Sequence, residues 1–304
     1  MISFLNSDSL HFFSKLRSLG EFVEQAQVRD SVAQILNDVR VRGDSALVEQ
    51  TRLFDGYDVI DVSELIIGPT TLLKAYDSID RVVRAALIES AERVREYHEK
   101  QKSFLQCQDG WRYTDSMGNQ LGQNIRAMGR IGIYAPGGKA SYPSTVIMTA
   151  IPAQVAGVKE IILCSPAPDG KHNPLLLAAA HLCGIERVFA IGGAQAVAAM
   201  AFGTEAVPKV DKIVGPGNIY VATAKGMVFG KVGIDMIAGP SEVVIVADES
   251  ADPEWVVQDM FAQAEHDEMA QAIVISPSEK LLRLIMELLP IKLAEQKRKS
   301  IIAE

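Results

Sequence analysis

Two side chains in the last fifth of the sequence have the chemistry and the spacing of metal ligands. Gln263 and His266 stand three residues apart, so in a helix both project from the same face. An imidazole nitrogen is a common zinc ligand and a carbonyl oxygen is an acceptable one, but a tetrahedral site needs about four donors. The pair therefore predicts half of a zinc site. By spacing alone, a histidine near a helix end is more often a surface or capping residue.

Three glycine-rich turns indicate a second kind of chemistry. They are Tyr134-Ala-Pro-Gly-Gly138, Gly192-Gly-Ala-Gln195 and Gly215-Pro-Gly-Asn218. Each opens onto a predicted helix, whose free N–H groups favour an anion such as the phosphates of a dinucleotide. None completes the G-x-G-x-x-G fingerprint, since Tyr220 stands where the third glycine would follow Gly215 and Gly217. A plain tight turn explains any one of them, whereas three at one level of a sheet favour a ligand.

Alternating strands and helices position these turns. Short apolar runs bounded by glycine or proline predict strands at 130–135, 160–164, 187–191, 212–214, 242–247 and 272–275. Helical spacing predicts helices at 145–156, 175–183, 194–202, 219–229 and 254–266, with Pro152 expected to kink or end the first. This alternation predicts an α/β fold with a mostly parallel sheet, in which ligands bind at the carboxyl ends of the strands.

The flanking regions have a different character. Residues 1–27 read as an N-terminal arm, and helical periodicity follows over 28–43 and 79–97. Residues 107–123 read as a polar hairpin or loop. Near the other end, the apolar helical stretch 281–289 is expected to lack packing partners within this chain.

The composition excludes several classes of protein. A net charge of −8, with no long basic stripe, argues against non-specific nucleic-acid binding. The sequence has no apolar run of the roughly 18 residues that a membrane span requires, and residues 1–6 lack the features of a secretory signal. Three widely spaced cysteines fit a reducing compartment, so we expect a cytoplasmic protein.

The combined motifs resemble the histidinol dehydrogenase family, in order, from about residue 28 to the end of the sequence. The segments that carry the resemblance are 130–138, 192–196, 201–205, 207–213, 215–218, 238–242 and 263–266. The resemblance implies oxidation of L-histidinol to L-histidine through the aldehyde, the last step of histidine biosynthesis, with two NAD+ and one zinc ion. It also implies two incomplete Rossmann-like parallel-sheet domains with a helical N-terminal region, and no standard dinucleotide fingerprint.

The resemblance assigns roles to individual residues and segments. It implies that Tyr134, Gln195 and Asn218 contact NAD, that Ser241 contacts the substrate, and that Gln263 and His266 bind both zinc and substrate. The expected domains are the arm 1–27, a first α/β domain made of 28–129 with 240–304, and an NAD-binding domain at 130–239. A homodimer with shared active sites is also implied.

The sequence departs from the family pattern near its end. The family's Glu-His acid/base pair, an aspartate ligand and a late histidine ligand have no counterpart after His266, so we expect a truncated chain with no turnover by itself. Two alternatives stay open: a dehydrogenase of another small polar alcohol, and a non-catalytic nucleotide-binding or interaction protein. The presence of Ser241, Gln263 and His266 favours an enzyme, because a binding module does not need these side chains.

Overall fold

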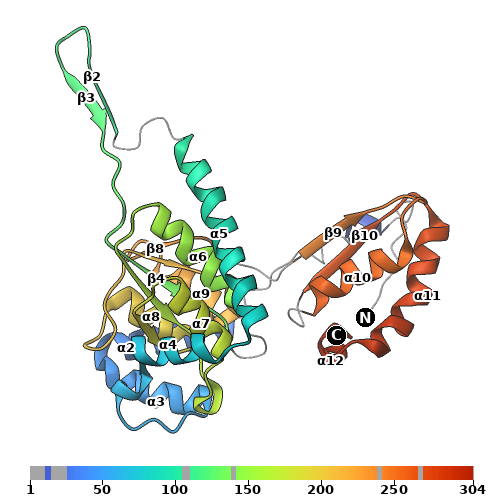
Figure 1. The fold of residues 1–304 in the computed structure, drawn as a ribbon, viewed down its shortest axis with the longest axis horizontal. Helices are drawn as coiled ribbons and strands as arrows, with labels where there is room; N and C mark the ends of the chain where they lie inside the picture. Colours follow the sequence, from blue (N-terminus) through green and yellow to red (C-terminus); the bar gives the residue numbers. More distant parts are fainter. Residues whose placement is uncertain are drawn as a thin grey trace. The chain divides into compact units, whose positions relative to one another are not determined.

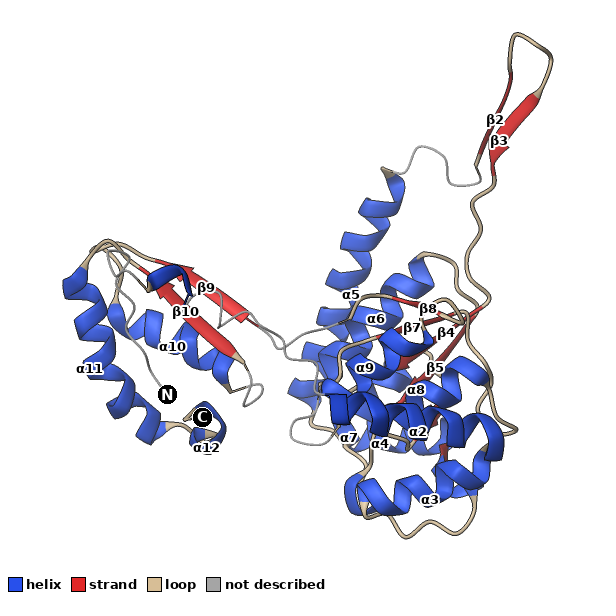
Figure 2. Ribbon diagram, turned by 180° about the vertical axis from the view of Figure 1, so that it is seen from behind, coloured by secondary structure: helices blue, strands red, loops and turns tan. Residues whose placement is uncertain are grey.

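The computed structural model describes residues 11–14, 26–104, 110–137, 142–237, 242–265 and 270–303 (Figures 1 and 2). The chain divides into two units. Residues 24–237 form the larger one, and residues 238–304 with 1–23 form the smaller. Each unit has its own hydrophobic core.

A six-stranded sheet forms the centre of the larger unit. Its order is β1-β6-β5-β4-β7-β8, with β1 antiparallel to β6 and the other neighbours parallel. The strands are β1 (Ile66–Ile67), β4 (Arg130–Tyr134), β5 (Glu160–Cys164), β6 (Arg187–Phe189), β7 (Lys212–Val214) and β8 (Gly233–Ile234). The chain runs outward from β4 through β5 to β6, then returns to the other side of β4 with β7. The topological switch point therefore lies between β4 and β7, where doubly wound sheets bind their ligands.

Two pairs of helices cover the faces of this sheet. They are α6 (Pro143–Val155) with α7 (Pro174–Leu182), and α8 (Gly193–Phe202) with α9 (Ile219–Val228). Because both faces are covered, the inner strands are apolar after a charged first residue, and Ile133, Ile162 and Leu163 are fully buried. The predicted parallel α/β arrangement is confirmed. Pro152 does not end α6, which continues for three more residues, so that part of the prediction was wrong.

A second helical layer lies outside the first. It consists of α2 (Ala26–Arg42), α3 (Asp44–Asp55), α4 (Pro69–Ser78) and α5 (Arg81–Ser103), with short 3-10 turns at Val62–Leu65 and Pro168–Gly170. α2 packs on α8 and α9, α4 on α7, and α5 on α6. Sequence periodicity missed α3 and α4. The predicted grouping of 28–129 with 240–304, like the boundaries of the other domains, stays a prediction.

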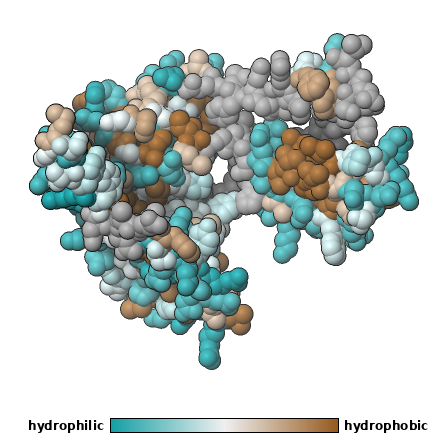
Figure 3. Space-filling view, turned by 90° about the horizontal axis from the view of Figure 1, so that it is seen from above, coloured by the Kyte–Doolittle hydropathy of each residue, from teal (hydrophilic) through white to brown (hydrophobic). Residues whose placement is uncertain are grey.

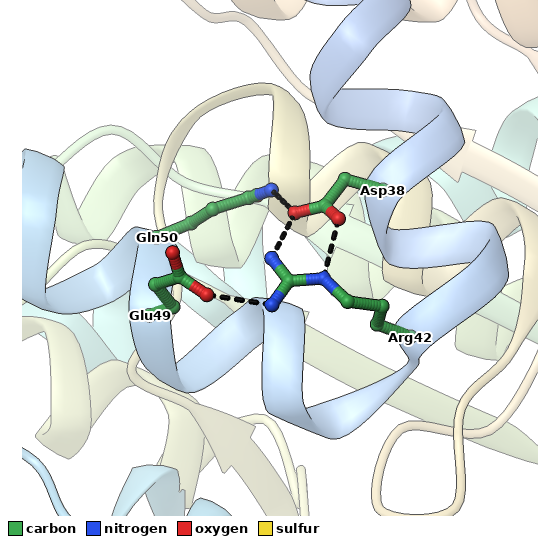
Figure 4. A network of polar contacts seen from close by, with 4 residues as sticks. All are labelled: Asp38, Arg42, Glu49 and Gln50. Carbon is green, nitrogen blue, oxygen red and sulfur yellow. Dashed lines mark hydrogen bonds and ion pairs between the residues drawn. The ribbon is translucent and has the colours of Figure 1, made fainter.

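A polar network fixes α3 against α2 (Figure 4). The Arg42 guanidinium donates to Asp38 at 2.6 Å and to Glu49 at 2.6 Å, and Gln50 Nε2 donates to the same Asp38 carboxylate at 2.7 Å. The hydrogen bond from Arg42 is the main reason why the pKa of Asp38 lies below its ordinary value. This network orients α3, whose last residue is Asp55.

An extended hairpin separates α5 from β4 (Figure 1). Strands β2 (Trp111–Thr114) and β3 (Gln120–Gln123) pair antiparallel, and all eight of their residues are exposed. The rings of Trp111 and Tyr113 stack with centroids 5.9 Å apart. The prediction of a hairpin or loop is confirmed over the part of this segment that the structure describes.

The smaller unit is a βαβ element followed by helices. Strand β9 (Glu242–Val246) pairs parallel with β10 (Gln271–Ile275), and α10 (Pro253–Ala264) lies between them in the sequence. Helices α11 (Glu279–Glu295) and α12 (Lys299–Ile302) follow β10. Leu281, Ile285 and Leu289 of α11 are buried with Phe261 and its neighbours on α10. The stretch 281–289 therefore has packing partners, contrary to the prediction, because one face of α11 rests on α10.

Among the described residues, the other face of the β9–β10 sheet is largely exposed. Residues paired in register share a face, so Val244 and Val246 lie on the same side as Ile273 and Ile275. Val244 is 54% exposed, Val246 78% and Ile275 53%. Figure 3 shows apolar side chains gathered on this unit. Among the described helices of both units, none is long and apolar enough to cross a membrane.

Candidate functional site

The turn after β7 packs directly against the end of β4. Gly215 has a φ of 114°, and a Cβ added there would clash with the carbonyl oxygen of Tyr134. Glycine is thus required both by the backbone conformation and by the close approach. Asn218 ends this turn and caps α9, because its side-chain oxygen accepts a hydrogen bond from the Val221 N–H at 3.2 Å. The structure therefore places Asn218 at the switch point, on the turn that touches Tyr134.

An ion pair between a buried lysine and a partly exposed aspartate holds this turn in place. Lys225 is 1% exposed, and its ammonium donates to the Gly215 carbonyl at 2.8 Å while pairing with Asp235. The Asp235 carboxylate in turn accepts the Gly215 N–H at 2.8 Å. Both polar groups of Gly215 are thus held by one pair of opposite charges. Sequence reasoning missed these two residues, although a lysine inside the apolar helix 219–228 is a signal that could have found them.

Tyr134 and Gln195 meet at the turn after β6. The Gly193 N–H donates to the Tyr134 hydroxyl at 3.1 Å, and Gln195 Oε1 lies beside the same glycine. Tyr134 is almost fully buried, and this burial raises the pKa of its phenol well above the ordinary value. Gln195 is 1% exposed, yet its Nε2 has no hydrogen-bond partner within the described part of the chain. A buried amide donor without an acceptor is unfavourable, so a ligand atom that accepts from it would be stabilising.

Asp55 reaches the same turn from the end of α3. Burial raises the pKa of its carboxyl to about 6, although a backbone hydrogen bond from Gly192 acts in the opposite direction. Its Oδ2 is buried and has no partner among the described residues. No sequence pattern singled out Asp55, because its nearness to Gly192 depends on the packing of residues far apart in the chain.

The protein itself uses several amides of these turns. Tyr134 accepts from Gly193, Asn218 accepts from Val221, and Asp235 accepts from Gly215. These N–H groups are therefore not free for an anion, which corrects part of the expectation drawn from the glycine turns. The turn after β6 is distinguished instead by two buried side-chain atoms, Asp55 Oδ2 and Gln195 Nε2, that have no partner in the described part of the chain.

The predicted metal and substrate residues belong to the smaller unit. Gln263 lies in the last turn of α10 and is half-buried. His266 and Ser241 lie outside the described residues, as does Gly138 of the first glycine turn. Within the described ranges, the structure contains no cluster of three or more His, Cys, Asp or Glu side chains able to hold a metal. The roles of Gln263, His266 and Ser241 stay predictions.

Comparison with known proteins gives consistent matches. The family model described as "Histidinol dehydrogenase" matches residues 21–304. The histidinol dehydrogenase of Pseudomonas syringae pv. tomato is 56% identical over 274 residues, covering 89% of this chain and 60% of the relative. That of Ralstonia nicotianae is 50% identical over 302 residues, covering 98% and 68%. The crystal structure of histidinol dehydrogenase from Elizabethkingia anophelis matches with a TM-score of 0.86 at 35% identity, covering 99% of this chain and 68% of that one. The first of these relatives is thus only about three-fifths spanned by the chain.

Proposed function

The chain belongs to the histidinol dehydrogenase family, and we propose that it takes part in the NAD-dependent, zinc-assisted oxidation of L-histidinol to L-histidine. In this reaction the alcohol carbon gives up one hydride to become the aldehyde, water adds, and the hydrated aldehyde gives up a second hydride. Each hydride goes to one NAD+, and the remaining protons are released. A homodimer and a cytoplasmic location are part of the same proposal.

The turn at the switch point is the observation that carries the proposal. Gly215 is pressed against the end of β4, where a doubly wound sheet binds a dinucleotide, and Asn218 closes the turn. The unpartnered Nε2 of Gln195 fits a ligand that presents hydrogen-bond acceptors, as a dinucleotide does. We assign Tyr134, Gln195 and Asn218 to binding NAD, whose nicotinamide ring accepts the hydride when it is bound.

The donors proposed for zinc are an amide oxygen and an imidazole. Gln263 and His266 supply these two atoms, and their chemistry suits zinc. Bound there, zinc would hold the substrate and orient its reacting C–H bond. Ser241 is assigned to the substrate. Helix α10 positions Gln263 for this role, because the apolar side of α10 packs on α11.

Titration calorimetry with NAD+ tests the cofactor site. The wild-type chain should bind NAD+, and Asn218→Ala should bind it at least about tenfold more weakly, as expected for the loss of a polar contact worth about 1.4 kcal/mol. Asn173→Ala is the matched control, because Asn173 caps α7 through the Leu175 N–H at 2.9 Å just as Asn218 caps α9. Both variants lose a helix cap, so equal binding by the two would remove Asn218 from the site.

A second experiment tests the reaction. NADH formation from L-histidinol is measured with added zinc, for the chain alone and for the chain mixed with the remaining part of a relative. We expect turnover in the mixture that disappears in His266→Ala. NAD+ binding without zinc binding or turnover in any mixture would instead support a nucleotide-binding protein, and turnover of other alcohols at a higher rate would support a related dehydrogenase.

A further inference from the structure

No acidic residue stands directly after β5, where doubly wound dehydrogenase sheets usually have one. In that fold an acidic side chain after the second strand accepts a hydrogen bond from a ribose hydroxyl of NAD. Counting outward from the switch point, β4 is the first strand and β5 the second. β5 is followed directly by Ser165 and Pro166, and the first carboxylate after them, Asp169, has a side chain 72% exposed and pairs with Lys171 at 3.6 Å. The segment after the second strand therefore supplies only an exposed carboxylate that is already paired with a lysine.

Asp55 brings a carboxylate to the same place from another part of the chain. A Cβ added at Gly192 would lie 2.6 Å from Pro166 Cβ and 3.4 Å from Asp55 Oδ1. Asp55 and Pro166 therefore flank one glycine at the carboxyl edge of the sheet. The placement depends on α3, which the Arg42 network of Figure 4 fixes against α2.

The polar atoms left unpartnered here are complementary. Asp55 Oδ2 is an acceptor and Gln195 Nε2 is a donor, and neither has a partner among the described residues. Asp55 borders Gly192 and Gln195 borders Gly193, so the two side chains approach consecutive residues of one turn. A ribose hydroxyl can donate to the first and accept from the second. A phosphate group cannot donate when ionised, and it would meet the carboxylate as a like charge.

A purely structural role explains Asp55 poorly. Burial raises the pKa of the Asp55 carboxyl even though it accepts a hydrogen bond from Gly192, so the ionised form destabilises the folded chain, and an asparagine has almost the same shape without the charge. Groups that cost stability in this way are concentrated at binding and catalytic sites.

We propose that Asp55 binds a ribose hydroxyl of the dinucleotide, together with Gln195, and that it selects NAD+ over NADP+. This inference rests on the proposed NAD-dependent function. It adds the residue that recognises the ribose, which the motifs in the sequence do not contain.

Binding measurements on wild type, Asp55→Asn and Asp58→Asn test the proposal. Asp58 is the matched control, since it lies three residues away with a side chain 99% exposed. Dissociation constants for NAD+ and NADP+ are measured by calorimetry, and folding of each variant is checked by its thermal transition. We expect Asp55→Asn to weaken NAD+ binding about tenfold or more and to reduce the preference for NAD+ over NADP+, while Asp58→Asn changes neither.

The outcomes separate this inference from the function on which it rests. If the wild-type chain binds no dinucleotide, both fail. If it binds NAD+ and a folded Asp55→Asn binds equally well with an unchanged preference, the assignment of Asp55 alone is overturned. Asp55→Ser, which removes the carboxylate but keeps a hydroxyl, provides a second measurement should Asp55→Asn fail to fold, and the same two results decide it.

Discussion

The β4 strand of the larger unit and the β9 strand of the smaller one have similar apolar sequences but different surroundings. Ile133 in β4 is fully buried, because helices cover both faces of the six-stranded sheet. Val246 in β9 is 78% exposed, because α10 packs on one face of the β9–β10 sheet and, among the described residues, the other face is open. Five-residue apolar strands are thus compatible with both surroundings. The number of covering layers, and not the strand sequence, decides how much an apolar residue contributes to stability.

The largest expected effect on stability is in the sheet whose two faces are covered by helices. Ile133→Ala should lower the free energy of unfolding of the larger unit by about 2–5 kcal/mol, because it removes buried methyl and methylene groups and leaves a cavity. Urea denaturation measures this value. A loss below about 1 kcal/mol would mean that the sheet is less tightly covered than described.

The second-largest difference is expected between the ion pairs of the two units, in the free energy of unfolding that is lost when the lysine is replaced. Lys225 is buried, whereas Lys292 pairs with Glu254 at 3.4 Å with side chains 21% and 56% exposed. Lys225→Met should cost about 2–4 kcal/mol, because it leaves the half-exposed Asp235 and the Gly215 carbonyl without their partner. Lys292→Met should cost about 1 kcal/mol or less. Equal losses of unfolding free energy for the two variants, measured with denaturant, would show that the buried lysine contributes no more than the partly exposed one.

Asp55 and Asp248 should give opposite dependences on pH. Folding raises the pKa of Asp55 from 3.8 to about 6, so ionisation is less favourable in the folded chain. The stability that the neutral form provides is fully present below pH 3.8 and is lost as the pH rises to about 6. Asp55→Asn should therefore stabilise the chain above pH 6, by about 1 kcal/mol after allowance for the part of the carboxyl that water reaches.

Asp248 provides the comparison within the smaller unit. Hydrogen bonds from the Ser250 hydroxyl and N–H lower the pKa of this carboxyl, so its contribution is present above the ordinary value and is lost as the pH falls. Thermal transitions recorded from about pH 2 to about pH 8 test both signs, because Asp248 titrates below its ordinary value of 3.8. If Asp55→Asn and wild type keep a constant difference over this range, Asp55 is not a destabilised carboxylate.

The smallest effect is expected on the open face of the β9–β10 sheet. Val246→Thr should change the free energy of unfolding of this chain by no more than about 0.5 kcal/mol, because the side chain is mostly in water already. Ile245→Thr, on the covered face of the same strand, is the matched control and should cost clearly more. Similar losses for both would show that the open face is covered in solution.

Local sequence patterns were sufficient for most elements of the fold. Short apolar strands bounded by glycine, and helices of about ten residues between them, predicted β4 to β7, β9 and β10 and the helices that follow, to within a few residues. The short strands β1 and β8 and the helices α3 and α4 were missed. Two-residue strands have no periodicity to detect, and the apolar face of α3 is interrupted by polar residues such as Gln50, which is buried through its contact with Asp38.

The candidate site divides in the same way. The glycine turns and Asn218 were recognisable from the sequence, because a positive φ and a helix cap are properties of a few consecutive residues. Asp55, Lys225 and Asp235 were not, because their significance depends on which residues surround them. Asp55 lies more than 130 residues before Gly192 in the sequence, and burial raises the pKa of its carboxyl although the hydrogen bond from Gly192 acts in the opposite direction. The sequence by itself thus determined the parallel α/β architecture and the turns, since these follow from short-range periodicity and backbone conformation, and its combined motifs indicated the family by resemblance. The tertiary structure alone decided which polar groups are buried without partners, since burial and hydrogen bonding join residues that the sequence keeps far apart.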